Sequence, residues 1–211
     1  MDKNHTTFEN FQLLEENLIP SSTSLLFYEN AFSKIQLIRE ITSRQSLPIL
    51  YIDFDFLFSG YVKSELLIMK NLTLFTTLES KIDEILPQIL TKISTEPHLV
   101  IFDSINGLYN TLSSDPDSGR LVNTILMLIA RNTSFSNSIF LIFALAGKKE
   151  KNWLLPNGRQ ILENDNIKKI IISDRSKISI ESWSIPNGVI KIPNGVIIRD
   201  SEVSYIKIKL T

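Results

Sequence analysis

The stretch "LLFYENAFSKIQLIRE", residues 25–40, joins an apolar segment to an amphipathic one, with Lys34 at the junction. The segment "TSLLFY" (23–28) predicts a buried strand, and apolar residues at helical spacing predict a helix over 33–45. A strand that runs directly into a helix is the first half of a strand-helix-strand unit. The stretch therefore predicts an α/β fold, and it raises the question of whether Lys34 holds a phosphate.

Composition limits the classes of protein that this chain can belong to. A chain of 211 residues with 43% hydrophobic content can bury a substantial core, and a formal net charge of -1 gives no global attraction to nucleic acid or anionic membranes. The absence of cysteine excludes disulfides and thiolate sites. The longest apolar run, "SIFLIFALAG" (138–147), is too short to span a bilayer. We expect a cytoplasmic protein without membrane contact.

The expected domain organisation is an N-terminal segment or linker over residues 1–20 and one core domain over 21–211. Phe8 and Phe11 in the N-terminal segment are expected to pack onto the chain's own core.

Further strands and helices alternate along the chain. Strands are predicted over 47–56, 97–104 and 137–146, and helices over 79–94, bent or interrupted near Pro87, and over 119–134. Alternation of this kind predicts a mostly parallel sheet with helices on both faces. From about residue 167, short β segments separated by turn residues predict a C-terminal antiparallel meander that continues the sheet.

Charged residues follow or end three of these strands, where open α/β sheets bind their ligands. They are Lys34, the pair Asp53 and Asp55, and Asp103. In this order they resemble the ATPase core of the RecA superfamily, in particular the archaeal RadA and RadB recombinases and their KaiC-like relatives. The resemblance runs from about residue 20 to the end, and it implies a RecA-like three-layer core.

The phosphate loop is where the chain departs from this family. With the lysine of G-x-x-x-x-G-K-[ST] placed on Lys34, Tyr28 and Ser33 stand at the two glycines and Ile35 at the hydroxyl residue. The glycines let backbone N–H groups curl around phosphates, and the hydroxyl coordinates magnesium. The resemblance therefore implies a degenerate Walker A motif, with Lys34 as a vestigial cofactor-binding position.

The acidic positions of the family are better preserved. Asp55 falls on the glutamate that positions the attacking water, and Asp103 falls on the Walker B aspartate associated with magnesium. The polar segment that senses the terminal phosphate is replaced by Phe143, Ala144 and Leu145. We interpret Asp55 and Asp103 as vestigial catalytic positions, with capping of the next turn as the ordinary alternative. No residue is assigned to a metal.

These substitutions favour a pseudo-ATPase over an enzyme. The resemblance then implies a recombinase paralogue that uses no cofactor and serves as an accessory subunit in homologous recombination or DNA repair. Its expected partner is an active RadA-type recombinase or another RecA-fold paralogue, in a homo- or hetero-oligomer. Lys148, Lys149 and Lys151 lie beside Trp153, where RecA relatives carry a DNA-contacting loop, and predict weak binding of single-stranded DNA.

Two alternatives stay open. The first is a divergent active ATPase that uses Lys34, Asp55 and Asp103 with ATP and magnesium. The second is a RecA-fold scaffold in signalling or tRNA modification, like the KaiC-like signalling proteins or the RecA-like ring of the Elongator complex. Function is grafted onto folds, so the fold alone does not separate these readings.

Overall fold

The computed structural model describes residues 11–77, 81–149, 152–154, 167–172, 178–181, 191–192 and 195–196. The chain forms two compact units, Met1–Glu181 and Ser182–Thr211. The second unit contains an antiparallel pair of short strands, β10 (Lys191–Ile192) and β11 (Gly195–Val196). None of the described helices combines the length and apolar composition that a bilayer span requires.

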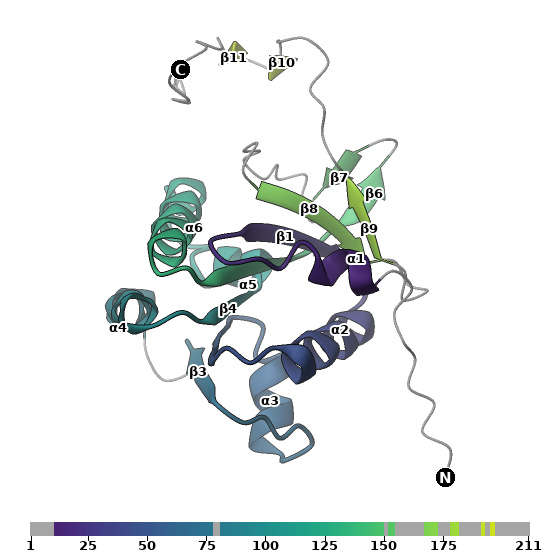
Figure 1. The fold of residues 1–211 in the computed structure, drawn as a ribbon. Helices are drawn as coiled ribbons and strands as arrows, with labels where there is room; N and C mark the ends of the chain where they lie inside the picture. The colour runs from purple at the N-terminus through teal and green to yellow at the C-terminus, as the bar shows by residue number, and fades with distance from the viewer. Residues whose placement is uncertain are drawn as a thin grey trace. The chain divides into compact units, whose positions relative to one another are not determined.

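A seven-stranded sheet forms the centre of the first unit (Figure 1). Its strand order is β3 (Leu72–Thr76), β2 (Ile49–Asp53), β4 (Leu99–Asp103), β5 (Ile139–Leu145), β1 (Thr23–Tyr28), β8 (Ile167–Ile172) and β9 (Ile178–Glu181). The first six strands are parallel, and β9 is antiparallel to β8. The predicted α/β class and mostly parallel sheet are confirmed.

The C-terminal part of the sheet differs in one detail from the expectation. Strand β8 pairs with β1 in parallel, so antiparallel pairing begins only at β9. The chain between β5 and β8 is long enough to cross over and return in the same direction, which a tight turn does not permit. Within that connection, β6 (Gly147–Lys149) and β7 (Asn152–Leu154) form a separate antiparallel pair.

Helices cover both faces of the sheet, as predicted (Figure 1). One face carries α1 (Phe11–Glu15), α2 (Ala31–Arg44) and α3 (Leu57–Lys63), and the other carries α4 (Ile82–Thr95), α5 (Ile105–Thr111) and α6 (Ser118–Phe135). Successive strand residues alternate between the two cores: Leu26 faces α2, while Leu25 and Phe27 face the α4 and α6 side. Coverage of both faces explains why these strands are continuously apolar.

The element boundaries follow the apolar pattern closely. Strand β1 matches its predicted range, and α2 starts at Ala31, two residues before the predicted start. The helix predicted over 79–94 is not interrupted at Pro87, because α4 runs through this residue, and the alternative of a bend there stays a prediction. The buried residues Ile85, Ile89 and Ile93 lie on one side of α4, and their packing onto the sheet outweighs one lost backbone hydrogen bond.

The N-terminal segment packs onto the core through α1. Phe11 and Leu14 are buried in the same core cluster as the apolar side of α2, and the Arg44 guanidinium lies 4.4 Å from the Phe11 ring centroid. The expected packing of Phe11 is confirmed, whereas Phe8 lies outside the described residues. The domain boundary at residue 20 stays a prediction.

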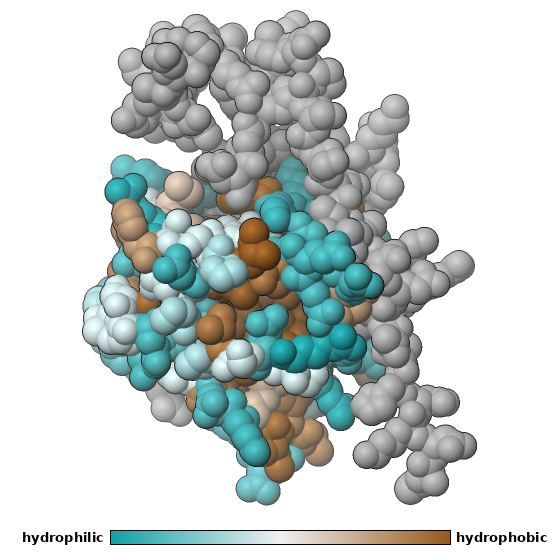
Figure 2. Space-filling model, viewed as in Figure 1, coloured by the Kyte–Doolittle hydropathy of each residue, from teal (hydrophilic) through white to brown (hydrophobic). Residues whose placement is uncertain are grey.

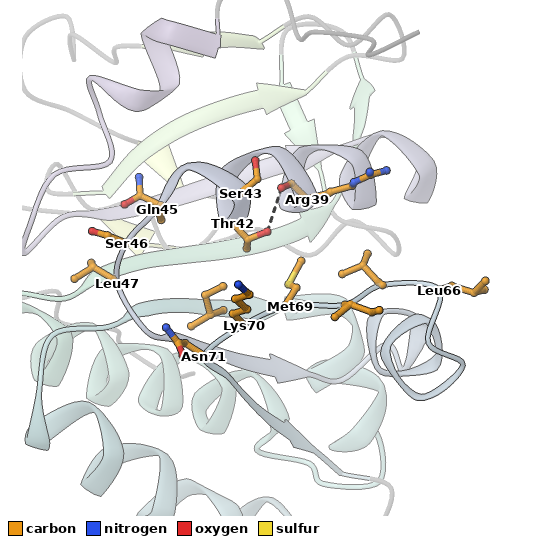
Figure 3. A pocket seen from close by; sticks show the side chains of 13 residues that line it. Arg39, Thr42, Ser43, Gln45, Ser46, Leu47, Leu66, Met69, Lys70 and Asn71 are labelled. Atoms are coloured by element: carbon orange, nitrogen blue, oxygen red, sulfur yellow. Dashed lines mark hydrogen bonds between the residues drawn. The ribbon is translucent and has the colours of Figure 1, made fainter. Parts of the chain in front are cut away.

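The surface of the first unit mixes hydrophilic residues with apolar ones, some of them beside α3 at the lower end of the face in Figure 2. A pocket opens between α2 and the connection from α3 to β3 (Figure 3). It lies at the end of the sheet where strands β2 and β3 begin, away from the predicted ligand edge.

Candidate functional site

The junction between β1 and α2 is a short turn, and a side chain of the turn itself caps the start of the helix. Only Glu29 and Asn30 separate the end of β1 from the start of α2. The Asn30 Oδ1 accepts a hydrogen bond from the Ser33 backbone N–H at 2.8 Å. A phosphate loop instead supplies a run of backbone N–H groups that point at the anion. Two residues are too few for that run, and the cap occupies one of the donors at the helix start.

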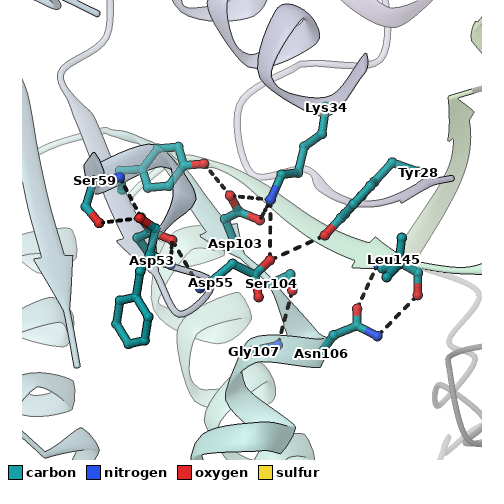
Figure 4. A network of polar contacts seen from close by, with 12 residues as sticks. Tyr28, Lys34, Asp53, Asp55, Ser59, Asp103, Ser104, Asn106, Gly107 and Leu145 are labelled. Carbon is teal, nitrogen blue, oxygen red and sulfur yellow. Dashed lines mark hydrogen bonds and ion pairs between the residues drawn. The ribbon is translucent and has the colours of Figure 1, made fainter. Parts of the chain in front are cut away.

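The structure brings together all three predicted site residues at the carboxyl ends of the strands (Figure 4). Lys34 lies in the first turn of α2, and its Nζ is 2.7 Å from Asp103 Oδ1 and 2.9 Å from Asp103 Oδ2. The same Nζ is 3.3 Å from Asp55 Oδ2. Only 1% of the Lys34 side chain and none of the Asp103 side chain is exposed. Lys34 is therefore enclosed in a buried ion-pair cluster.

Two tyrosines complete this cluster. The Tyr51 hydroxyl donates a hydrogen bond to Asp103 Oδ2 at 2.6 Å, and its ring stacks on Phe58 with centroids 3.8 Å apart. The Tyr28 hydroxyl donates to Asp55 Oδ2 at 3.3 Å, and its ring centroid lies 4.9 Å from Lys34 Nζ. The resemblance to the RecA superfamily predicts the first loop glycine at the position of Tyr28. Its ring fills space beside the lysine and contributes a cation–π contact.

Burial and charge set the protonation states of the cluster. Burial raises the pKa of Asp103 to about 6, although the Lys34 charge and hydrogen bonds from Lys34 and Tyr51 act in the opposite direction. Burial lowers the pKa of Lys34, but the charge of Asp103, its hydrogen bond with Lys34 and the charge of Asp55 outweigh this effect, and the net pKa lies above its usual value. Burial raises the pKa of Tyr28 to about 12 and that of Tyr51 well above its usual value. Both tyrosines are therefore neutral donors at neutral pH.

Asp53 has a structural role that sequence reasoning did not separate from that of Asp55. Its Oδ1 accepts backbone N–H groups from Asp55 at 3.1 Å and Phe56 at 2.9 Å, and its Oδ2 accepts that of Ser59 at 2.7 Å. These bonds satisfy backbone donors at the start of α3. Asp53 thereby fixes the turn that directs Asp55 toward Lys34.

The end of β5 is fixed by Asn106, a residue that sequence reasoning missed. The Asn106 Oδ1 accepts from the Leu145 backbone N–H at 2.7 Å, and its Nδ2 donates to the Leu145 carbonyl at 3.2 Å. Phe143 is buried beside Tyr28, with ring centroids 6.3 Å apart. Phe143 and Leu145 are two of the positions that the resemblance to the RecA superfamily assigns to a phosphate sensor. Here they serve packing and backbone hydrogen bonding.

Close packing also fills the space below Asp55. A side-chain Cβ on Gly107 would lie 2.5 Å from Asp55 Oδ1 and 2.7 Å from Phe54 Cβ. The Gly107 N–H donates to the Ser104 Oγ at 3.2 Å, which caps the start of α5. Glycine is required here because the helix approaches the Asp55 turn so closely.

The residues of this site do not fit ATP with magnesium in the way that the family binds them. An ammonium group has three donors, and those of Lys34 have carboxylate acceptors within 3.3 Å. The half-buried Ile35 has no hydroxyl to coordinate magnesium. Glu29 places an exposed carboxylate at the turn where phosphates would enter.

The predicted DNA-contacting lysines stay a prediction. Lys148 and Lys149 belong to β6, which pairs with β7. Their side chains and the whole of Lys151 lie outside the described part of the chain.

Comparisons with known proteins identify no family for this chain. No family model matches it, and no curated protein matches its sequence. Among solved structures, a KaiC-like protein from the hyperthermophilic archaeon Pyrococcus horikoshii OT3 aligns with a TM-score of 0.49 and 13% sequence identity. The alignment covers 92% of this chain and 97% of the archaeal one.

Proposed function

We propose that this chain is a non-catalytic RecA-fold paralogue, a pseudo-ATPase that acts by binding. In this proposal it is an accessory subunit in homologous recombination or DNA repair, and it binds an active RadA-type recombinase or another paralogue. The observation that carries the proposal is the closed state of Lys34, which lies under a two-residue turn and contacts Asp103 and Asp55. A lysine held in this way has no donor left for a phosphate.

Exposed apolar residues support a role of the same edge in protein binding. Phe32 lies in the first turn of α2 and is 70% exposed. Phe56 follows strand β2 and Leu145 ends strand β5, and both side chains are partly exposed. Large apolar residues at the rim of a filled site favour contact with another protein surface.

Calorimetric titration of ATP and magnesium into the full chain tests the loss of the nucleotide site. We expect no saturable heat, because phosphate binding must first break buried contacts of Lys34. Micromolar binding that Lys34→Ala abolishes would contradict the proposal. Lys34→Ala also destabilises the fold, so Asp55→Asn is the second test. It asks the same question of ATP binding at the partly exposed edge of the cluster, and it keeps the buried Lys34–Asp103 pair.

Affinity purification from the native host tests the partner. We expect recovery of a RadA-type recombinase or another RecA-fold paralogue, and recovery of RNA-modifying or signalling proteins instead would refute the recombination role. Phe32→Ser should reduce the recovery. Phe135→Ser is the matched control, because Phe135 is 74% exposed but lies at the end of α6.

A divergent active ATPase is the second candidate. The observation in its favour is that carboxylate oxygens of Asp55 and Asp103 both lie within 3.3 Å of the Lys34 Nζ. All three residues stand at positions that match family motifs. Magnesium-dependent ATP hydrolysis by the wild type that Asp103→Asn abolishes would establish this candidate and exclude the first one.

Weak binding of single-stranded DNA is part of the proposal and has its own test. A mobility shift that weakens with salt and disappears when Lys148, Lys149 and Lys151 are changed to glutamine supports it. An unchanged shift in that variant assigns DNA binding to another surface.

A further inference from the structure

The pocket at the opposite end of α2 has the chemistry of a binding site. Its volume is about 540 Å³, within the range of ligand sites in proteins. One wall is the last turns of α2 and the segment that leads to β2, and the other is the connection from α3 to β3 (Figure 3). Nearly half of the lining residues are apolar: Leu47, Ile49, Leu66, Leu67, Ile68 and Met69.

The charged residues that line this pocket among the described part of the chain are basic. Arg39 on α2 and Lys70 on the facing connection both line it, and both side chains are exposed. No acidic side chain lines the pocket, and among the described residues neither cation has a carboxylate partner. By contrast Arg44, near the end of the same helix, is paired with Glu40 and with Glu15 at 3.3 Å. The pocket therefore offers uncompensated positive charge beside apolar surface.

The lining also limits the class of ligand. None of the described residues that line the pocket is aromatic, so they offer no stacking surface of the kind that proteins use for nucleobases. At the end of α2 the Gln45 N–H occupies the Ile41 carbonyl oxygen, but the carbonyl oxygens of the last three helical residues have no intrahelical donor, and backbone N–H groups of a bound peptide can supply one. These features favour a peptide over a nucleotide.

Exposed apolar side chains at the rim of the pocket require a ligand long enough to cover them. Leu66 is 75% exposed and Ile68 is 88% exposed, on the connection that forms one wall. A small molecule inside the pocket would leave both in water. An extended peptide with apolar side chains can cover them and place a carboxylate near Arg39 or Lys70.

We propose that this pocket binds a partner protein through a peptide segment in which acidic residues flank bulky apolar ones. The cations select the acidic residues, and the apolar wall holds the side chains between them. The proposal concerns a surface separate from the Lys34 cluster. It does not depend on whether the chain binds ATP.

Three fluorescently labelled octapeptides test it by fluorescence anisotropy with the full chain. Each has a central Leu-Phe-Leu-Leu, flanked by pairs of aspartates, lysines or serines. We expect the aspartate peptide to bind at least about tenfold tighter than the other two, and increasing salt to reduce this preference. Equal binding of all three peptides, or no saturable binding of the aspartate peptide, would overturn the proposal.

Charge reversal assigns the binding to this pocket. The double variant Arg39→Glu/Lys70→Glu should weaken binding of the aspartate peptide by about tenfold or more. The control Lys81→Glu/Lys92→Glu makes the same change in net charge with exposed lysines at the two ends of α4, and it should bind as the wild type does. Equal weakening in both variants would mean that only net charge matters, and this result rejects the site.

Decanoate, with one carboxylate on an apolar chain, distinguishes a peptide site from a small-molecule site. We expect it to compete poorly, because it cannot cover both Leu66 and Ile68. Decanoate that binds as tightly as the aspartate peptide and displaces it would replace the proposal with a site for small anionic amphiphiles. Far-ultraviolet circular dichroism and thermal unfolding of each variant establish that the fold is retained.

Discussion

Lys34 and Arg39 belong to the same helix, five positions apart, and their surroundings are opposite. Lys34 is buried, and Asp103 and Asp55 neutralise it. Arg39 is exposed beside an open pocket, and no carboxylate pairs with it within the described chain. A buried charge must be paired to be tolerated, whereas an exposed one stays hydrated and available. The difference separates a closed ion-pair cluster at the strand ends from an open surface.

The largest expected effect is that of removing the buried cation. Lys34→Met should lower the free energy of unfolding by about 3–5 kcal/mol, because Asp103 is left buried without its cation. Urea unfolding at neutral pH measures it, with the exposed Lys92→Met as a control within about 0.5 kcal/mol of the wild type. A loss below about 1 kcal/mol would mean that the cluster is not the closed unit described here.

The pH dependence of stability should come next in size. The pKa of Asp103 is about 6 in the folded chain and about 3.9 in an unfolded one, so the folded state holds this proton more tightly. The contribution of Asp103 to stability is complete below about pH 4 and is lost as the pH rises to about 6, by about 2–3 kcal/mol. Asp103→Asn should remove this component. Parallel pH profiles of urea unfolding for the two proteins would contradict the expectation.

Removing one hydroxyl should have a smaller effect. Tyr51→Phe deletes the donor to Asp103 and keeps the ring stacked on Phe58, so we expect a loss of about 1.5–2 kcal/mol. Thermal or urea unfolding measures it. Tyr61→Phe, a change of a half-buried tyrosine on α3 outside the cluster, is the comparison. An equal loss in both variants would show that Tyr51 has no special role in the cluster.

The smallest effect should come from the second cation of α2. Arg39→Ala should change the free energy of unfolding by no more than about 0.5 kcal/mol, because an exposed and unpaired side chain contributes little. A loss comparable to that of Lys34→Met would remove the contrast between the two ends of the helix.

Much of the fold is predictable from the sequence because the long elements have clear periodicity. Strand β1 and helices α2 and α6 begin and end within about two residues of their predicted bounds. Short elements such as α3, α5 and edge strand β3 were not predicted, since five to seven residues do not establish a period. The convergence of Lys34, Asp55 and Asp103 followed from the alignment of parallel strand ends.

Other contacts of the site could not be predicted from the residues near them in the sequence. Tyr51 reads as one more apolar strand residue, and its partner Asp103 is 52 positions away. Asn106 holds Leu145 across 39 positions. The pocket exists only because β2 pairs with β3, a contact extended by the hydrogen bond from the Ile49 N–H to the Asn71 carbonyl. Such contacts depend on which segments meet in space.

The amino-acid sequence by itself determined the α/β class, the strand ends that carry charge, and the absence of glycine and of a following hydroxyl residue beside Lys34. These properties are local, because periodicity and side-chain chemistry are set within a few residues. Only the tertiary structure decided that the two aspartates enclose Lys34 while Arg39 stays exposed. Packing decides burial, and burial decides whether a charge must be paired.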